Sequence, residues 1–282
     1  MFKNIRFPII NRFTCTEGQL NSIIANIKNK NMLPILDYAN ENNLDCKNNY
    51  QQLINLINNY PNNLISIKLS SFNIKNNISE AESKVFNLVK LAKKNNSKIL
   101  IDAENYLLQD NINFISDKLM KIFNKDKVII YKTYQMYRKD SFEILKNDFL
   151  SKREYFIGCK LVRGAYYNED FKYNILFDNI NDTHVNYDKG IKFVIDNLKK
   201  EDILMCATHN LNSIEYTKRL IKNSNKKIEF SQLLGMSDVL SSNLAKNYSV
   251  YKYLPFGNFK DTLPYLLRRL YENYPMLLNI FK

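Results

Sequence analysis

Short apolar runs rich in β-branched residues recur along the chain and alternate with stretches whose apolar residues repeat at helical spacing. Eight such runs occupy residues 32–37, 64–70, 98–103, 127–134, 155–162, 203–208, 227–234 and 249–255. Strands that alternate with helices pair in parallel, and eight continuously apolar strands can close on themselves. The pattern therefore predicts an α/β fold, a (β/α)8 barrel that occupies residues 1–282 as one domain.

The helical stretches carry their own start signals. Thr16 and Gln19 form a capping-box pattern, and an amphipathic helix is expected to follow it within a helical lead-in over residues 1–31. Ser79 and Glu82 form the same pattern and predict the start of the helix before the third strand. Helix starts thus fall between the predicted strands, as a barrel requires.

Composition narrows the class of protein without deciding it. The chain has 282 residues, 45% of them hydrophobic, which is a normal size for one closed barrel. Its net charge of +13 could serve nucleic acid, an anionic membrane or an acidic ligand. Lysines are spread along nearly the whole chain in company with asparagine, which favours a compositional bias over a dedicated polyanion site.

Metal and disulfide chemistry find little support. The four cysteines lie far apart, and neither of the two histidines lies in a ligand-spaced cluster, so no metal site is expected. No apolar run approaches the roughly 18 to 20 residues that span a bilayer, and the first residues lack a signal-peptide pattern. The expected location is cytoplasmic, or peripheral on the inner membrane of a bacterium or mitochondrion.

Polar and aromatic side chains collect at the carboxyl ends of the predicted strands, where barrels of this kind carry their active sites. In chain order they are Glu41, Lys68, Asp102, Glu104, Gln135, Lys160, Arg163, Tyr166, Thr208, His209, Asn210, Gln232, Tyr253 and Phe256. A purely structural rim needs no such concentration of charged groups and amides. The rim is therefore predicted to be a functional site.

Each of these residues also has a structural explanation on its own. The run CKLVRGAYY delivers Lys160 and Arg163 and then a Gly-Ala step over which a flat ligand can approach the backbone, but a charge followed by glycine is common at strand ends. Asp102 could be a general base, or it could cap the next helix. His209 could be a structural histidine. Only the combination favours function.

Two adjacent arginines, Arg268 and Arg269, lie on a predicted helix after the eighth strand. Their side chains point about 100° apart on a helix, yet they are long enough to converge on one carboxylate, which a guanidinium binds through two hydrogen bonds. Glu272, one turn later, can orient one of them. The alternative is a solvated ion pair on an outer helix.

Several motifs in order resemble one known family. IDAEN, TYQMY, CKLVRGAYY, ATHN, QLLGMSD, YKYLPFG and LPYLLRRLYEN resemble proline dehydrogenase, a flavoenzyme that occurs alone and within bifunctional proline utilisation A proteins. The resemblance runs from about LDYANE to RRLYEN and covers most of the chain. It implies a distorted (β/α)8 barrel with FAD at the carboxyl ends of the strands and a last helix over the barrel mouth. LDYANE, which contains Glu41, departs from the family's usual Leu-Gly-Glu, and the stretch around Lys68 is shorter than in many relatives.

The resemblance also implies roles for single residues. Asp102 and Lys160 would act beside the reacting groups. Lys68, Arg268 and Arg269 would bind the proline carboxylate, and Glu272 would pair with the two arginines. Tyr166, Leu233 and Tyr253 would enclose the proline ring. The residues in contact with FAD would be Ala103, Gln135, Lys160, Arg163, Gly164, Ala165, Thr208, His209 and Asn210.

The reaction so implied is FAD-dependent oxidation of L-proline to 1-pyrroline-5-carboxylate by hydride transfer to flavin N5, with a quinone as electron acceptor. A separate pyrroline-5-carboxylate dehydrogenase would act next, and the basic surface could bring the protein to anionic lipid. A tyrosine at position 253 implies a preference for proline over 4-hydroxyproline. Two other interpretations stay open: a flavin barrel that acts on another cyclic or N-alkyl amino acid, and a catalytically silent basic barrel that serves as a scaffold or binds nucleic acid.

Overall fold

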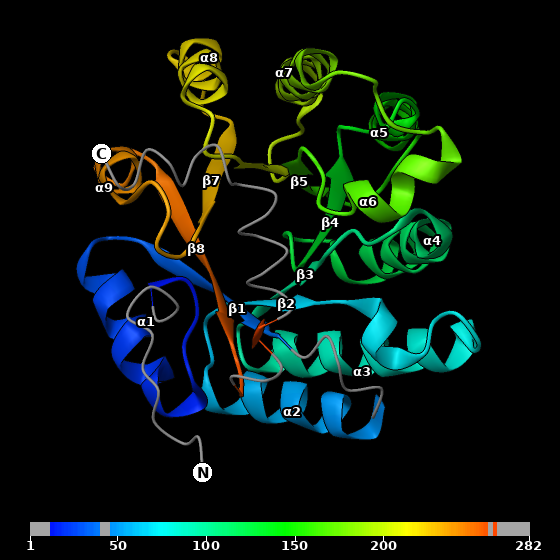
Figure 1. Ribbon diagram of the computed structural model, residues 1–282, viewed down its shortest axis with the longest axis vertical. Helices are drawn as coiled ribbons and strands as arrows, with labels where there is room; N and C mark the ends of the chain where they lie inside the picture. The colour runs from blue at the N-terminus through cyan, green and yellow to red at the C-terminus, as the bar shows by residue number, and fades with distance from the viewer. Residues whose placement is uncertain (1–11, 40–45, 259–261, 264–282) are drawn as a thin grey trace.

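The computed structural model describes residues 12–39, 46–258 and 262–263. Within these ranges eight parallel strands close into a barrel, in which each strand pairs with its neighbours in sequence and β8 returns to β1 (Figure 1). The strands are β1 Leu33–Tyr38, β2 Leu64–Ile67, β3 Lys98–Ile101, β4 Ile130–Gln135, β5 Gly158–Val162, β6 Ile203–Ala207, β7 Lys227–Leu233 and β8 Ser249–Phe256. The predicted (β/α)8 fold is confirmed.

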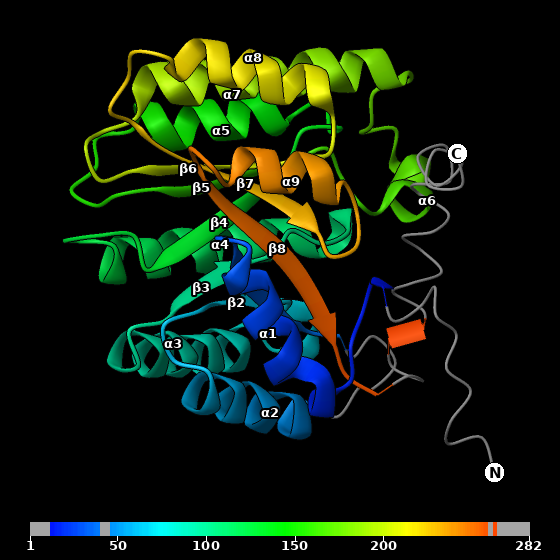
Figure 2. The same cartoon turned by 90° about the vertical axis from the view of Figure 1, so that its left-hand side faces the viewer.

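Helices surround this barrel (Figure 1). Those in the described ranges are α1 Leu20–Asn29, α2 Cys46–Asn59, α3 Ile78–Lys94, α4 Tyr106–Phe123, α5 Ser141–Leu150, α6 Tyr167–Asp170, α7 Ile180–Asn197, α8 Leu211–Ile221 and α9 Asp238–Leu244. The short α6 lies at the end of the barrel toward which the arrows of β7 and β8 point (Figure 2). No helix in the described part of the chain combines the length and apolarity needed to cross a bilayer.

One part of the fold prediction lies outside the described residues. The expected last helix over the barrel mouth, with Arg268, Arg269 and Glu272, falls in residues 264–282, and Glu41 falls in residues 40–45. These positions therefore stay predictions.

Alternation along the strands produces two apolar layers. Ile35, Leu100 and Tyr131 belong to a cluster inside the barrel. Their neighbours Leu36 and Ile99 belong to a second cluster, which the surrounding helices complete. Because the interior is filled with side chains, the barrel is a packed core rather than a pore, and the loops at the strand ends are left to carry a site.

The predicted starts of β4 and β5, at residues 127 and 155, are each three residues too early. Residues 128–129 and 155–157 are apolar, but side chains bind their backbone where a strand partner was expected. Asn124 Oδ1 accepts the N–H groups of Ile129 and Ile130 at 2.9 Å each, and Asp202 Oδ1 accepts the N–H of Ile157 at 2.7 Å. These residues are apolar because they pack at the amino end of the barrel, although they do not belong to a strand.

The predicted end of β2 at residue 70 is also wrong. The strand stops at Ile67, Lys68 is still extended, and residues Leu69–Phe72 form a 3₁₀ turn. Leu69 and Phe72 are fully buried in that turn, so the run stays apolar although the strand has ended. As a result, Lys68 stands at the carboxyl end of its strand.

One of the two predicted capping boxes is confirmed and the other is displaced. Thr16 and Gln19 form the expected pair. The N-cap of α3 is instead Asn77, whose Oδ1 accepts the N–H of Glu80 at 3.0 Å, two residues before the predicted Ser79. Asparagine caps a helix at least as well as serine, so the earlier start is the stable one.

A fully buried ion pair closes the amino end of the barrel. Arg153 donates from Nη1 and Nη2 to the two carboxylate oxygens of Asp202, at 2.8 and 2.5 Å, and neither side chain has any exposed surface. Asp202 also accepts the N–H groups of Ile157 and Lys199. The carboxylate therefore organises the turn before β6 and the entry into β5.

We expect Arg153→Met to lower the free energy of unfolding by about 3–5 kcal/mol, because it leaves Asp202 buried without its counter-ion. Urea unfolding followed by circular dichroism measures the change. Lys192→Met is the matched control, since it removes the exposed ion pair Lys192–Asp196 and should leave unfolding unchanged. Equal losses in the two variants would contradict this account.

Candidate active site

A cavity of about 610 Å³ opens at the carboxyl ends of the strands. Most of the predicted site residues that the structure describes lie on its wall: Lys68, Asp102, Ala103, Gln135, Lys160, Arg163, Gly164, Ala165, Tyr166, Thr208, His209, Asn210, Gln232, Leu233 and Tyr253. Glu104 and Phe256, predicted at the same rim, do not line this cavity. They come from the ends of seven strands, from β2 to β8. The structure thus brings together residues that lie up to 185 positions apart in the range 68–253.

Asp102 is the centre of a buried network on this wall. Its Oδ1 accepts from Lys160 Nζ at 2.8 Å, and its Oδ2 accepts from Ser66 Oγ and from the Tyr253 hydroxyl, each at 2.6 Å. Lys160 Nζ also lies 5.0 Å from the centre of the Tyr253 ring. Burial by itself raises the pKa of Asp102, but Lys160 and Lys68 together with these hydrogen bonds outweigh it and lower the pKa to about 2. Asp102 is therefore an anion at neutral pH.

Lys68 has a buried partner that the sequence analysis did not identify. Its Nζ donates to Asp37 Oδ1 at 2.6 Å, and the Asp37 side chain is only 2% exposed. Asp37 lies inside β1, so it reads in the sequence as part of an apolar run. A carboxylate within an apolar strand could have indicated a buried ion pair, because a buried charge needs a nearby partner.

The Gln135 amide binds two loops of the protein. Its Nε2 donates to the Glu104 carbonyl oxygen at 2.8 Å, and its Oε1 accepts the N–H of Ala165 at 3.2 Å. Glu104 in turn accepts the N–H of Ser70 at 2.9 Å, and its burial raises the pKa of its carboxyl group. Gln135 therefore ties the loop after β3 to the loop after β5, on the wall of the cavity.

Arg163 extends from the end of β5 toward α7 and α8. Its Nε donates to His184 Nδ1 at 2.8 Å, Nη1 to Thr208 Oγ1 at 2.6 Å and Nη2 to Ser213 Oγ at 2.9 Å. The guanidinium carbon lies 4.3 Å from the centre of the Tyr187 ring, and burial lowers the pKa of Arg163. All of these partners are neutral, so within residues 12–39, 46–258 and 262–263 no carboxylate is bound to the guanidinium, and Asp188 acts on it only through space.

Gly164 gives the cavity wall a segment of bare backbone. Its φ is +146°, and a Cβ at this position would lie 2.4 Å from the Tyr137 ring. The Tyr137 hydroxyl donates to Asp170 Oδ2 at 2.7 Å, which fixes that ring behind the glycine. Only glycine fits here, because a side chain would displace Tyr137.

His209 connects the ends of β6 and β7. Its Nε2 accepts the N–H of Leu233 at 3.2 Å, and its Nδ1 lies 3.2 Å from Ser237 Oγ. Lys252 holds the same loop from the outer side of the barrel by donating to the Met236 carbonyl oxygen at 2.7 Å. The position of Leu233 on the cavity wall therefore depends on a buried lysine that does not line the cavity.

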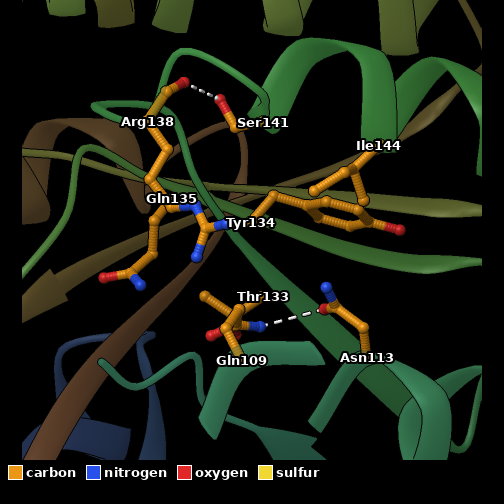
Figure 3. Close-up of a pocket in the computed structure, with 8 residues that line it drawn as sticks. All are labelled: Gln109, Asn113, Thr133, Tyr134, Gln135, Arg138, Ser141 and Ile144. Atoms are coloured by element: carbon orange, nitrogen blue, oxygen red, sulfur yellow. Dashed lines mark hydrogen bonds between the residues drawn. The ribbon is translucent and has the colours of Figure 1, made fainter. Parts of the chain in front are cut away.

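A second and much smaller cavity lies between β4, α4 and α5, directly behind Thr133 and Gln135, which line both cavities (Figure 3). The Arg138 guanidinium is directed into it, and two hydrogen bonds to Asp140, at 2.9 and 2.6 Å, hold it there. Arg138 Nη1 has no hydrogen-bond partner among the described residues. At about 20 Å³ the space suits about one water molecule, so it is not the site of an organic ligand.

Six residues that line the large cavity were missed or not singled out. They are Thr133, Val162, Ile180, His184, Ala207 and Ser231. Thr133 and Ser231 lie two positions before Gln135 and Leu233, so the period of two along a strand could have identified them. His184 and Ile180 come from α7, and no pattern in the sequence indicates that this helix reaches the cavity.

Comparison with known proteins shows which family has sequences similar to this chain. The model of the proline dehydrogenase family matches residues 19–277. Mitochondrial proline dehydrogenase 1 of Dictyostelium discoideum is 36% identical over 225 residues, which cover 73% of this chain and 39% of that protein. A hydroxyproline dehydrogenase of Xenopus laevis is 31% identical over 214 residues, which cover 69% of this chain and 46% of that protein.

Among solved structures, proline utilization A from Bdellovibrio bacteriovorus, inactivated by N-propargylglycine, has the same fold. It matches with a TM-score of 0.85 and 18% identity, over 94% of this chain and 32% of that one. The chain thus spans less than half the length of the relatives that it matches. Since the family model covers nearly all of its residues, the chain belongs to the proline dehydrogenase family.

Proposed function

We propose that this chain oxidises L-proline to 1-pyrroline-5-carboxylate, with FAD in the large cavity as hydride acceptor and a quinone as the final electron acceptor. Membership of the family supports the oxidation of proline. The observation that carries the proposal for this chain is the buried Asp102–Lys160 pair on the wall of a cavity of about 610 Å³, a size typical of cofactor sites.

The residues around the cavity fit a flat cofactor that carries an anionic chain. Arg163 offers a positive charge that no carboxylate among the described residues binds, and the Gly164 backbone has no side chain to obstruct a ring. When bound, FAD would supply the hydride acceptor, N5 of its ring. Lys160 would supply positive charge where negative charge develops as the ring is reduced.

We further propose that Lys68 binds the substrate carboxylate together with Arg268 and Arg269, which lie outside the described residues. Asp37 keeps the Lys68 ammonium group in one place, so the carboxylate meets a fixed charge. A hydride leaves with its electron pair from the ring carbon beside nitrogen, and a C=N bond forms only if that nitrogen has lost its extra proton. Asp102, already an anion paired with Lys160, acts by holding that lysine rather than by donating a proton.

The first test is spectroscopic. The purified protein should show the visible absorption of an oxidised flavin, and anaerobic L-proline should bleach it, because a hydride, which carries two electrons, passes to the ring. Addition of a quinone in anionic liposomes should then restore the band, and faster than the same quinone in neutral liposomes, since the protein carries a net charge of +13.

Two results would count against parts of this proposal. A colourless protein that binds DNA in a salt-dependent way would favour a silent, basic scaffold. A flavin that L-proline leaves oxidised, while another cyclic or N-alkyl amino acid bleaches it, would keep the cofactor and replace the substrate.

We expect Asp102→Asn to slow bleaching by L-proline about a hundredfold while the flavin content stays the same, because Lys160 loses its counter-ion and its fixed position. Stopped-flow absorbance measures the rate. Asp196→Asn, which breaks the exposed pair Lys192–Asp196, is the matched control and should react at the normal rate. Unchanged bleaching in Asp102→Asn would remove the central role assigned to the pair.

A second candidate substrate is 4-hydroxyproline, because a hydroxyproline dehydrogenase is among the relatives. The Tyr253 hydroxyl is engaged by Asp102 and Ser66, and its side chain is buried on the cavity wall, so it fills space that an extra hydroxyl needs. We therefore expect kcat/KM to be at least about tenfold higher for proline, and Tyr253→Ser to reduce that preference. Equal values for the two substrates in the unaltered protein would argue against this role of Tyr253.

A further inference from the structure

The two histidines of this chain are held in opposite neutral forms. Arg163 Nε can only donate, so His184 Nδ1 must accept, and the ring proton of His184 lies on Nε2. The Leu233 N–H donates to His209 Nε2, so the ring proton of His209 lies on Nδ1 and is directed to Ser237. Both rings are therefore fixed by donors that cannot change their role.

His184 is the more consequential of the two, because its acceptor nitrogen binds a cation, whereas that of His209 binds a backbone N–H. Two charged groups face His184: Arg163, which follows the end of β5, and Asp188, which lies on α7 like His184 itself. Thr208 and Ser213, which bind the same guanidinium from the end of β6 and from α8, are neutral. Burial and then Arg163 lower the pKa of His184, while Asp188 opposes them. The neutral form of His184 is therefore favoured, and the ring takes up a proton only at a pH below the usual pKa of a histidine.

Protonation of His184 would have two effects. The ring would lose the lone pair that accepts from Arg163, and a second positive charge would stand beside the guanidinium. An added charge attracts an anion, but His184 is partly exposed, so water and salt screen that attraction. Loss of a hydrogen bond to a charged group is not screened in this way. Orientation of Arg163 therefore outweighs the added charge.

We propose that neutral His184 is a positioning residue for Arg163 and, through it, for the anionic diphosphate of the cofactor, so that protonation of His184 weakens cofactor binding in acid. This inference rests on the proposal that FAD occupies the large cavity. His184 and Arg163 both line that cavity. Within the described ranges the N–H groups of Arg163 donate to neutral acceptors. The positive charge of this cation on the cavity wall can therefore bind an anionic ligand.

The test measures binding of FAD to protein from which the cofactor has been removed. Flavin fluorescence gives the dissociation constant at about pH 7.5, 6.5 and 5.5 and constant ionic strength. In the unaltered protein we expect the constant to rise about three- to fivefold over this range, most of it at the acid end, because the pKa of His184 is lowered. In His184→Asn, whose amide oxygen can still accept from Arg163 but does not titrate, it should change less than about twofold. His209 is present in both proteins, so it cannot account for a difference between them.

A double-mutant cycle gives the matched control. Arg163→Lys removes the Nε donor, so it should weaken FAD binding at every pH and abolish the acid dependence, and adding His184→Asn should then change little. If His184→Asn keeps the full acid dependence, or if FAD binds more tightly in acid, the inference fails while FAD binding itself stands. If FAD does not bind at any pH, both this inference and the proposed cofactor fail.

A measurement without ligand tests the geometry directly. In ¹⁵N NMR at neutral pH, His184 should show its proton on Nε2 and His209 on Nδ1, and His184→Asn assigns the two sets of signals because only two histidines exist. Detection of the His184 proton on Nδ1 would exclude the hydrogen bond from Arg163 on which the inference depends.

Discussion

A carboxylate buried at the mouth of a barrel is stable only if every part of its charge is compensated. Asp102 meets this condition with three donors that come from three other strands: Ser66 from β2, Lys160 from β5 and Tyr253 from β8. Their convergence requires the barrel to be closed, because β2 and β8 meet only through β1. The candidate active site and the closure of the sheet are therefore one constraint: the network that makes Asp102 an anion also fixes the strand ends relative to one another.

The rest of the cavity wall is held by side chains that bind backbone rather than ligand. Gln135 joins the loops after β3 and β5, and Lys252 holds the loop after β7 from the outside. Tyr137 fixes the bare backbone at Gly164. Loops at the mouth of such a barrel are free to vary, so their positions have to be specified by contacts of this kind. The precision of the site is thus set partly by residues that no ligand would touch.

Cations in the described part of the chain differ in what they bind. Lys132, Arg153 and Lys252 are almost completely buried and each reaches a carboxylate, as expected for buried charges in a core. Arg163 is different, since a histidine, a threonine and a serine fix its direction, and no carboxylate in the described part of the chain is hydrogen-bonded to it. The Asp188 carboxylate acts on it only through space. A guanidinium that is oriented but not paired is suited to bind an anion with little reorganisation. This contrast separates cations that stabilise the fold from one that is prepared for a ligand.

The sequence by itself determined the period of the elements and the identity of the residues at the strand ends, because alternation and apolar runs are local properties. This was enough for the barrel, for all eight strands and for the set of residues on the cavity wall that the ordered motifs indicated. It placed the starts of β4 and β5 too early, since the backbone there is bound by the side chains of Asn124, in the preceding loop, and of Asp202, 45 residues further along the chain. Only the tertiary structure decided which polar groups are paired: the charges of Asp37 and Lys68, the charges of Asp102 and Lys160, and the neutral His184 with the Arg163 guanidinium. Pairing depends on distances between strands and helices that are remote in sequence, and no local pattern contains those distances.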